Sequence, residues 1–348
     1  MADGRPDAVG PAGEAIRRAI AGAGGRITFQ RFMSMALYGT DGFYAGGGRA
    51  GRRGDFLTSP EVGPLFGAVL ARYLDAVWDE LGRPAPFDVV EVGAGPGTLA
   101  RTIQAARPAV AAAGRYLAVE TSAAQRARHP EGVISLAEPP AVDVAGVVLA
   151  NELLDNLPFR LVVFDGAWRE AMVADDGGRL VEVLGPPLAD VPAVLPTTAP
   201  LGARAALQEA ASEWVTAARA LLPRGRVLAI DYTRPTTSVM SATPWREWLR
   251  TYAGHRRGRH YLADPGGQDI TVDVALDQLP HPDRRLDQAA FLRRWGIEGL
   301  VAEGNAVWAE RAASPDLRAL TMRSRAREAE ALLDVAGLGG FDVLEWSV

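Results

Sequence analysis

The sequence predicts an α/β fold built on a doubly wound, mostly parallel sheet, and two observations support this prediction. Short, nearly continuous apolar runs alternate with spacers long enough for helices, which is the pattern of parallel strands buried on both faces. The first of these runs ends in a glycine-rich loop that leads into a predicted helix. The chain has 348 residues, a length that suits about two domains or one large domain with insertions. The predicted core strands are 87–92, 116–120, 133–136, 145–150 and 226–232.

The N-terminal part precedes the sheet and is expected to cover it. Residues 1–26 are predicted to form a loose segment followed by a first helix, because Gly, Pro and Ala dominate its beginning. Residues 27–84 are predicted to form a glycine-rich flap at 45–54 and a helical cap. In the cap, apolar residues have helical spacing in 29–37 and again from Pro64 to Leu81.

The remaining chain divides by the spacing of its apolar residues. Residues 85–158, 200–232 and 315–348 are expected to form the α/β core. Residues 159–199 contain three strand-like runs separated by Asp-Gly turns, which predicts an antiparallel insertion. Residues 233–314 are expected to form a second cap that carries substrate contacts, and its first part, 233–283, is expected to be irregular. Further elements are predicted as helices at about 203–222, 287–302 and 315–336 and as a last strand at 341–347.

Composition excludes several kinds of chemistry. The chain has no lysine, which excludes P-loop nucleotide hydrolysis, pyridoxal phosphate enzymes and Schiff-base aldolases. It also has no cysteine, so disulfides, cysteine-ligated zinc, iron–sulfur clusters and thiol nucleophiles are excluded. The four histidines are widely spaced and form no metal-binding motif. No metal is therefore expected.

The net charge and the hydropathy of the sequence limit the classes of partner that the protein is expected to bind. The formal net charge of −5 provides no general field for phosphate backbones, so no nucleic-acid partner is expected. The first residues are acidic and lack the apolar segment of a secretory signal, and no apolar run reaches membrane-spanning length. The sequence predicts a cytoplasmic protein without a membrane partner.

The strongest functional signal is the segment EVGAGPGT after the first predicted core strand. Closely spaced glycines let the backbone turn sharply and approach a ligand, and the next helix points its N-terminal N–H groups toward that ligand. A dinucleotide fingerprint would need a third glycine where Thr98 stands, which counts against a nicotinamide-dependent oxidoreductase. An acid two residues before GxGxG instead resembles class I S-adenosylmethionine-dependent methyltransferases. The candidate cofactor-binding residues here are Glu91, Gly93, Ala94, Gly95, Gly97 and Thr98.

Polar residues at other predicted strand ends extend this candidate site. Glu120 ends the second core strand, where a carboxylate can accept hydrogen bonds from both ribose hydroxyls of an adenosyl group. Asn151, Glu152 and Asp155 follow the fourth core strand. Because ligands in open α/β sheets bind beyond the carboxyl ends of the strands, these side chains are expected to face the methyl group and its acceptor. Asn151 is a candidate for the amino-acid part of the cofactor or for the acceptor.

The order of several longer motifs resembles the MidA-like methyltransferases, a family that includes a mitochondrial complex I assembly factor that dimethylates an arginine. The resemblance runs from about Ile27 to the C-terminus. Two departures are Thr233, where the family has glycine after tyrosine, and an unusual C-terminal segment. The motifs are LYGTDGFY (37–44), GDFLTSPEVGPLFG (54–67), EVGAGPGT (91–98), ANELLDNLP (150–158), AIDYT (229–233), WLRTYAGHRRG (248–258) and QDITVDV (268–274).

This resemblance implies a Rossmann-like methyltransferase core with S-adenosyl-L-methionine as cofactor and a protein arginine nitrogen as the first acceptor to test. For a guanidinium acceptor, a carboxylate can orient the nitrogen and polarise its N–H, which makes Glu152 and Asp155 the leading catalytic candidates. His255, in an arginine-rich stretch, is a third. Thr58, Ser59 and Glu61 are expected either to close over the cofactor or to cap a helix.

Two other functions remain open at this stage. One is methyl transfer to a small molecule or peptide on a biosynthetic route. The other is an assembly factor that keeps the methyltransferase fold but acts mainly by binding a partner. The sequence contains no feature that indicates the oligomeric state.

Overall fold

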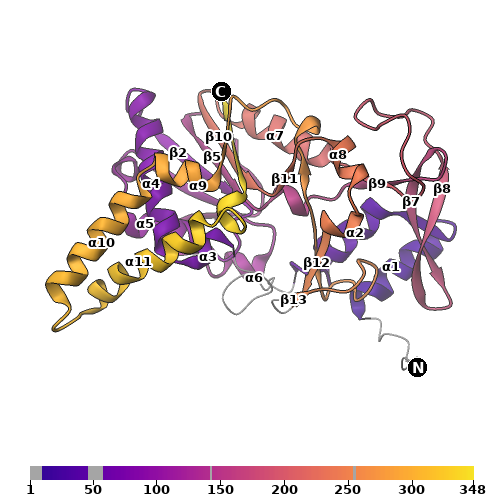
Figure 1. The fold of residues 1–348 in the computed structure, drawn as a ribbon, viewed down its shortest axis with the longest axis horizontal. Helices are drawn as coiled ribbons and strands as arrows, with labels where there is room; N and C mark the ends of the chain where they lie inside the picture. Colours follow the sequence, from indigo (N-terminus) through magenta and orange to yellow (C-terminus); the bar gives the residue numbers. More distant parts are fainter. Residues whose placement is uncertain (1–9, 46–57, 142, 254–255) are drawn as a thin grey trace.

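The computed structural model describes residues 10–45, 58–141, 143–253 and 256–348. A large mixed sheet with helices on both faces lies beside a smaller antiparallel sheet (Figure 1). Beyond Ala45, the flap expected at 45–54 falls outside the described residues, and so does His255.

The large sheet has seven strands in the order β16-β17-β10-β5-β2-β3-β4. The strands from β10 to β4 run parallel, whereas β17 is antiparallel to β10 and β16 is antiparallel to β17. Val90 pairs with Leu117 and Val148, and all three are buried. Burial on both faces explains the continuous apolar runs, and the α/β fold class is confirmed. The strands are β2 (Phe87–Val92), β3 (Gly114–Val119), β4 (Ile134–Leu136), β5 (Ala145–Asn151), β10 (Gly225–Asp231), β16 (Arg284–Asp287) and β17 (Asp342–Ser347).

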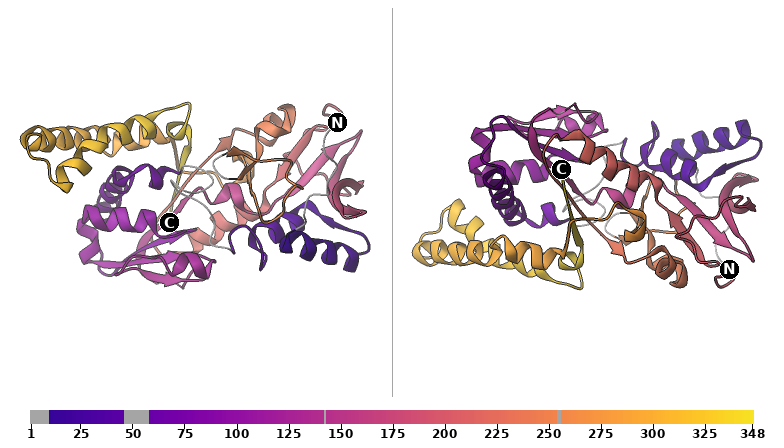
Figure 2. Two further views of the ribbon diagram at one scale, coloured as in Figure 1. Left: turned by 90° about the horizontal axis from the view of Figure 1, so that it is seen from below. Right: turned by 90° about the horizontal axis from the view of Figure 1, so that it is seen from above.

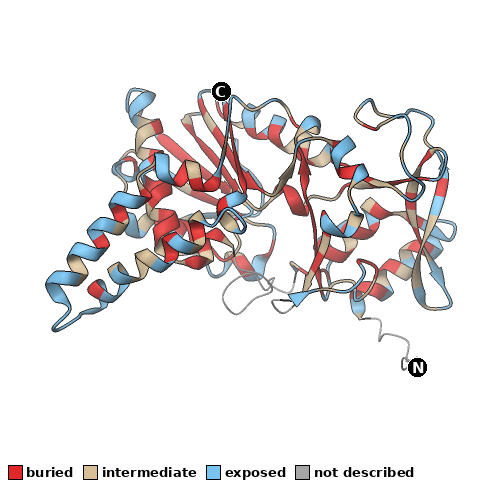
Figure 3. Ribbon diagram, in the orientation of Figure 1, coloured by how far each residue is buried: buried red, intermediate tan, exposed pale blue. Residues whose placement is uncertain are grey.

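Helices cover both faces of the large sheet. On one face, α4 and α5 share a core with the strands through residues such as Leu70 and Ile103. On the other face, Val215 of α7 packs in a second core with Val148. Figure 3 shows that the central strands of the sheet are almost entirely buried, as β2, β5 and β10 are. The elements of these layers and of the sheet's loops are α3 (Ser59–Val62), α4 (Pro64–Glu80), α5 (Thr98–Ala106), η1 (Ala109–Ala112), α6 (Ala123–Arg126), η2 (Leu154–Asn156) and α7 (Glu209–Leu221).

The antiparallel insertion predicted for 159–199 belongs to a five-stranded sheet. Strand β1 from the N-terminal segment and strand β9 both pair into it. Phe29 of α2 contacts Tyr261 edge to face, with ring centroids 5.0 Å apart, in the core under this sheet. The N-terminal helices, the insertion and a later segment therefore share one apolar core. The elements are α1 (Pro11–Gly22), β1 (Arg26–Thr28), α2 (Phe29–Tyr38), β6 (Arg160–Phe164), β7 (Trp168–Asp176), β8 (Arg179–Pro187) and β9 (Arg204–Leu207).

Two secondary-structure predictions are wrong in this region. A helix was expected from about 203, but β9 occupies Arg204–Leu207 and α7 begins only at Glu209. The segment 233–283, expected to be irregular, contains a three-stranded sheet in the order β13-β12-β14 and the pair β11-β15. Its elements are β11 (Thr233–Arg234), α8 (Thr237–Ala242), η3 (Trp245–Glu247), β12 (Leu249–Ala253), β13 (Arg256–Arg257), β14 (Asp269–Val272), β15 (Val274–Ala275) and η4 (Leu276–Gln278).

The C-terminal helices project from the end of the molecule opposite the antiparallel sheet, as Figure 2 also shows. The helix predicted at 287–302 is broken, because Gly296 adopts a left-handed φ of 81° between α9 and α10. Strand β16, which the sequence did not predict, precedes α9. The elements are α9 (Gln288–Arg294), α10 (Ile297–Arg311), α11 (Leu317–Leu333) and η5 (Leu338–Gly340).

None of the helices in the described ranges is both long and apolar enough to cross a bilayer. The cellular compartment expected from the sequence stays a prediction.

Candidate active site

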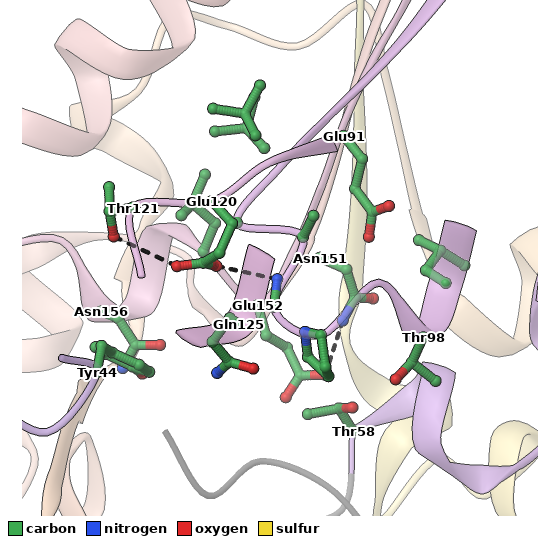
Figure 4. Close-up of a pocket in the computed structure, with 18 of the residues that line it drawn as sticks. Tyr44, Thr58, Glu91, Thr98, Glu120, Thr121, Gln125, Asn151, Glu152 and Asn156 are labelled. Carbon is green, nitrogen blue, oxygen red and sulfur yellow. Dashed lines mark hydrogen bonds between the residues drawn. The ribbon is translucent and has the colours of Figure 1, made fainter. Parts of the chain in front are cut away.

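A cavity of about 370 Å³ lies beyond the carboxyl ends of β2, β3, β4 and β5. Figure 4 shows polar side chains from these strand ends pointing toward one another around it. The position agrees with the rule that ligands in open α/β sheets bind at this edge. The cavity is lined by Tyr38, Tyr44, Thr58, Pro60, Glu61, Glu91, Val92, Gly93, Ala94, Gly95, Pro96, Thr98, Leu99, Val119, Glu120, Thr121, Gln125, Ala137, Glu138, Pro139, Asn151, Glu152, Leu153, Asn156, Leu157 and Trp214.

The glycine loop between β2 and α5 forms one wall. Gly93, Gly95 and Gly97 have φ values of 72°, 52° and 74°, a region that other residues rarely adopt. A Cβ on Gly97 would lie 2.8 Å from Pro130 Cδ, whereas a Cβ on Gly95 would meet open space. His129 Nε2 donates to the Gly95 carbonyl oxygen at 2.9 Å. The predicted residues of this loop line the cavity, except Gly97, whose part is to shape the turn.

Glu120 lies against this loop. Its Oε2 accepts a hydrogen bond from the Gly95 N–H at 3.0 Å, and its Oε1 accepts one from the Ser122 N–H at 2.8 Å. Because each carboxylate oxygen can accept two hydrogen bonds, Glu120 keeps acceptor capacity for hydroxyls of a ligand. The predicted ribose-binding carboxylate therefore lines the cavity with its orientation already fixed.

Glu91 at the end of β2 is a second acid on the cavity wall and is buried. Burial raises the pKa of Glu91 to about 7, although the Tyr116 hydroxyl, which donates to Glu91 Oε2 at 2.7 Å, opposes this shift. A buried carboxyl group that titrates near neutrality can bind a ligand as an acceptor or as a donor.

The segment before α4 closes another side of the cavity. Thr58 and Glu61 line it, and Thr98 Oγ1 donates to Glu61 Oε1 at 2.8 Å. Ser59 is buried, does not line the cavity, and donates from Oγ to Gln288 Oε1 at 2.9 Å. Of these three predicted residues, two have side chains placed for a ligand and the third ties α3 to α9.

Asn151 and Glu152 lie side by side at the end of β5, as Figure 4 shows. Asn151 Nδ2 donates to Glu152 Oε1 at 3.0 Å, and the Tyr232 hydroxyl donates to Glu152 Oε2 at 3.1 Å. Burial raises the pKa of Glu152 to about 7, while these two donors act to lower it. Glu152 has a φ of 52°. A non-glycine residue in this strained region is typical of functional sites.

Asp155 occupies a different position from Glu152. It is 2% exposed and does not line the cavity. Its neighbours include the carboxyl groups of Asp231 and Asp269, and burial beside them raises its pKa well above the usual range. The structure therefore does not bring Asp155 to the cavity wall with Glu152. His255, the third catalytic candidate, lies outside the described residues.

Several lining residues were not among the predicted site residues, although Tyr38 and Tyr44 lie in the motif LYGTDGFY and Asn156 lies in ANELLDNLP. Tyr38 and Tyr44 come from the N-terminal segment and stack with ring centroids 5.4 Å apart. The Tyr44 hydroxyl donates to Asp269 Oδ1 at 3.0 Å, and Asn156 Nδ2 donates to the same oxygen at 3.2 Å. Three segments far apart in the sequence therefore meet at this wall.

The polar groups that line the cavity fit an adenosyl cofactor that carries an amino-acid group. Asn151 Oδ1 and Gln125 Oε1 are buried and have no hydrogen-bond partner among the described residues, so both acceptors are available to a ligand. Most of the cavity wall is apolar, which suits an adenine ring. Within the described ranges, the His, Asp and Glu side chains form no group that could hold a metal ion. Fold and site together define a class I S-adenosylmethionine-dependent methyltransferase.

Comparisons with known proteins agree with this class. The chain matches the family described as "Putative S-adenosyl-L-methionine-dependent methyltransferase" over residues 69–292, more than half of its length. A crystal structure from Burkholderia thailandensis, bound to S-adenosyl-homocysteine, is similar with a TM-score of 0.83 and 30% identity. That alignment covers 97% of this chain and 92% of the other.

Two curated relatives are named protein arginine methyltransferase NDUFAF7. The Drosophila melanogaster homolog is 26% identical over 282 residues, which span 69% of this chain and 62% of the fly protein. The Homo sapiens protein is 37% identical over 76 residues, 22% of this chain and 17% of the human one. The matches thus leave more than a third of each relative uncovered.

The chain belongs to the MidA-like family of S-adenosyl-L-methionine-dependent methyltransferases. The resemblance in the sequence motifs, the enzyme class and the cofactor are confirmed.

Proposed function

We propose that the protein transfers the methyl group of S-adenosylmethionine to a side-chain nitrogen of an arginine in a protein substrate. One observation carries the proposal. The carboxyl group of Glu152 lines the cavity next to Asn151, and the buried carboxyl group of Asp269 lies within electrostatic range of it. The names of the curated relatives also support an arginine acceptor.

An acidic environment favours a cationic acceptor. A guanidinium is always charged, is weakly hydrated, and can donate two parallel hydrogen bonds to one carboxylate. Tyr38 and Tyr44 add aromatic surface to the same cavity, and aromatic faces attract flat cations. A neutral acceptor would gain neither the ionic hydrogen bonds nor the contact with aromatic faces.

The cofactor would be held by groups that are already oriented. Glu120 would accept hydrogen bonds from the ribose hydroxyls, and the free Oδ1 of Asn151 would accept one from the amino group of the methionine part. The N-terminal N–H groups of α5 would face the cofactor's polar groups. Bound S-adenosylmethionine supplies a methyl group that its positive sulfonium has already activated.

Glu152 would have two tasks in this site. Its oxygens would accept hydrogen bonds from the acceptor's N–H groups and so orient the nitrogen. It would also take up the proton that this nitrogen loses on methylation. A pKa of about 7 suits a group that must release the proton again near neutral pH.

The test is transfer of tritium-labelled methyl from S-adenosylmethionine into an extract of cells that lack the protein. The proposal expects label in a protein band and, after acid hydrolysis, in methylated arginine. Glu152→Gln, which keeps the shape of the side chain, is expected to slow transfer by about 100-fold or more while binding S-adenosylhomocysteine normally. Glu131→Gln, on the exposed loop before β4, is the matched control. Label confined to small molecules or to other amino acids would contradict the proposal.

A further inference from the structure

The carboxylate of Asp231, at the end of β10, ties two strand-end loops together. Its Oδ1 accepts the Tyr232 N–H at 2.9 Å, and its Oδ2 accepts the N–H groups of Leu154 at 2.8 Å and Asp155 at 3.3 Å. Asp231 is buried. Burial and the carboxyl group of Glu152 raise the pKa of Asp231 to about 8, whereas the three backbone hydrogen bonds act to lower it. These hydrogen bonds favour the ionised form of Asp231 over that of a buried neighbour that lacks such donors.

The residues directly before and after Asp231, Ile230 and Tyr232, both form a hydrogen bond with Glu152. The Glu152 N–H donates to the Ile230 carbonyl oxygen at 2.8 Å, and the Tyr232 hydroxyl donates to Glu152 Oε2 at 3.1 Å. Because Glu152 has the strained φ of 52°, its backbone keeps this conformation only while the surroundings enforce it. The three hydrogen bonds to Asp231 fix the loop that carries Glu152.

Asp155 lies beside Asp231 but lacks comparable donors. Its Oδ1 is buried and has no hydrogen-bond partner within the described part of the chain. Burial and the carboxyl groups of Asp231, Asp269 and Glu152 raise the pKa of Asp155, and Arg250 opposes them. When two buried carboxyl groups compete for one proton, the group without donors takes it.

We infer that Asp231 and Asp155 form an unequal carboxyl pair in which Asp155 holds the proton and ionised Asp231 positions Glu152. The role of the pair in catalysis rests on the proposed function of Glu152. The assignment of the proton does not, because it follows from the hydrogen bonds alone. Asp231 is then the positioning residue, and Asp155 is not the base.

The pair predicts a specific dependence of stability on pH. Asp155 keeps its proton in the folded state and loses it near pH 4 in the unfolded state, so the folded state binds one more proton above that pH. Stability therefore falls as the pH rises from about 4 through the raised pKa of Asp155. The groups facing Asp155 that modulate this dependence are Glu152, Asp231, Tyr232, Arg250 on β12, Asp269 on β14, and Tyr38 and Tyr44.

The first experiment measures Tm from about pH 5 to about pH 8, above the pKa of an aspartate in the unfolded state, for the wild type and Asp155→Asn. Asparagine resembles the neutral carboxyl group, so the variant lacks the proton linkage. The Tm of Asp155→Asn is expected to rise relative to the wild type as the pH increases. Asp190→Asn, on an exposed loop, is expected to run parallel to the wild type. A parallel curve for Asp155→Asn overturns the assignment, even if arginine methylation is confirmed.

The second experiment measures kcat, KM and S-adenosylhomocysteine affinity. Asp155→Asn is expected to keep kcat within about threefold, whereas Asp231→Asn, which cannot accept the three N–H groups equally, is expected to lower kcat by about tenfold or more. Cofactor affinity should change little in both. Loss of turnover in Asp155→Asn as complete as in Glu152→Gln would make Asp155 a base and overturn the inference. If Asp231→Asn does not fold, the inference is judged on the Tm curve and the kcat of Asp155→Asn.

Discussion

Glu120 Oε2 accepts a hydrogen bond from the Gly95 N–H at 3.0 Å, so the acid that follows β3 and the glycine loop after β2 form one unit. Glu120 Oε1 is held in turn by the Ser122 N–H at 2.8 Å. A ligand hydroxyl therefore meets an acceptor whose rotamer is already fixed, and binding costs little side-chain entropy.

The glycine loop should not tolerate a side chain at Gly97. A Cβ there would lie 2.8 Å from Pro130 Cδ, and the φ of 74° is unfavourable for alanine. Gly97→Ala is expected to lower the free energy of unfolding by about 1–3 kcal/mol and to weaken S-adenosylhomocysteine binding, because the loop must shift. Thermal unfolding with and without the ligand measures both effects.

Gly166→Ala is the matched control for Gly97→Ala. Gly166 has a φ of 104°, but a Cβ there would meet nothing within 4 Å. It shares the backbone strain without the collision and lies outside the cavity. Equal ligand stabilisation of both variants would contradict the role given to the loop.

Methyl transfer should depend on the ionisation of Glu152. Its pKa is raised to about 7, and a base acts only when it is deprotonated, so kcat/KM should fall about tenfold per pH unit well below 7. Tyr232→Phe removes a donor that favours the ionised form, so the ascending limb should move to higher pH. Initial rates from about pH 5.5 to 9 test this; a profile that is flat across neutrality would rule out Glu152 as the base.

The C-terminal helix α11 should stabilise the start of α4 through Glu328. The start of α4 directly follows the segment in which Thr58 and Glu61 line the cavity. This buried carboxylate accepts the Leu65 N–H at 2.8 Å at the start of α4. Glu328→Ala leaves that N–H without its partner and should cost about 1–3 kcal/mol in urea unfolding. Glu330→Ala changes an exposed residue on the same helix and should cost less than about 0.5 kcal/mol. Similar losses in both would refute the link.

The sequence predicted β2, β5 and β10 well because each is an apolar run buried on both faces. It missed β9 because RAAL contains strong helix formers and only pairing with β6 makes it a strand. It missed β16 because RRLD is polar and lies at the sheet edge. Both strands form only by pairing with strands that are distant in the sequence, and a local sequence pattern carries no information about such pairing.

The sequence predicted those residues of the candidate site that lie at the ends of the core strands. Glu91, Glu120, Asn151 and Glu152 line the cavity as the topology requires. Tyr38 and Tyr44 lie in the motif LYGTDGFY, but only tertiary packing brings them to the cavity, as it brings His129 to the glycine loop. Sequence also could not distinguish Ser59, which turns to Gln288, from Thr58, or Asp155 from Glu152, since those differences lie in side-chain direction.

The most direct test of the account is calorimetric titration of the protein and of Glu120→Ala with S-adenosylhomocysteine and, separately, with NAD. The account predicts roughly micromolar affinity for S-adenosylhomocysteine, weakened by about 1.5–3 kcal/mol in Glu120→Ala, and no comparable binding of NAD. Equal S-adenosylhomocysteine affinity in both proteins, or preferential binding of NAD, would contradict it.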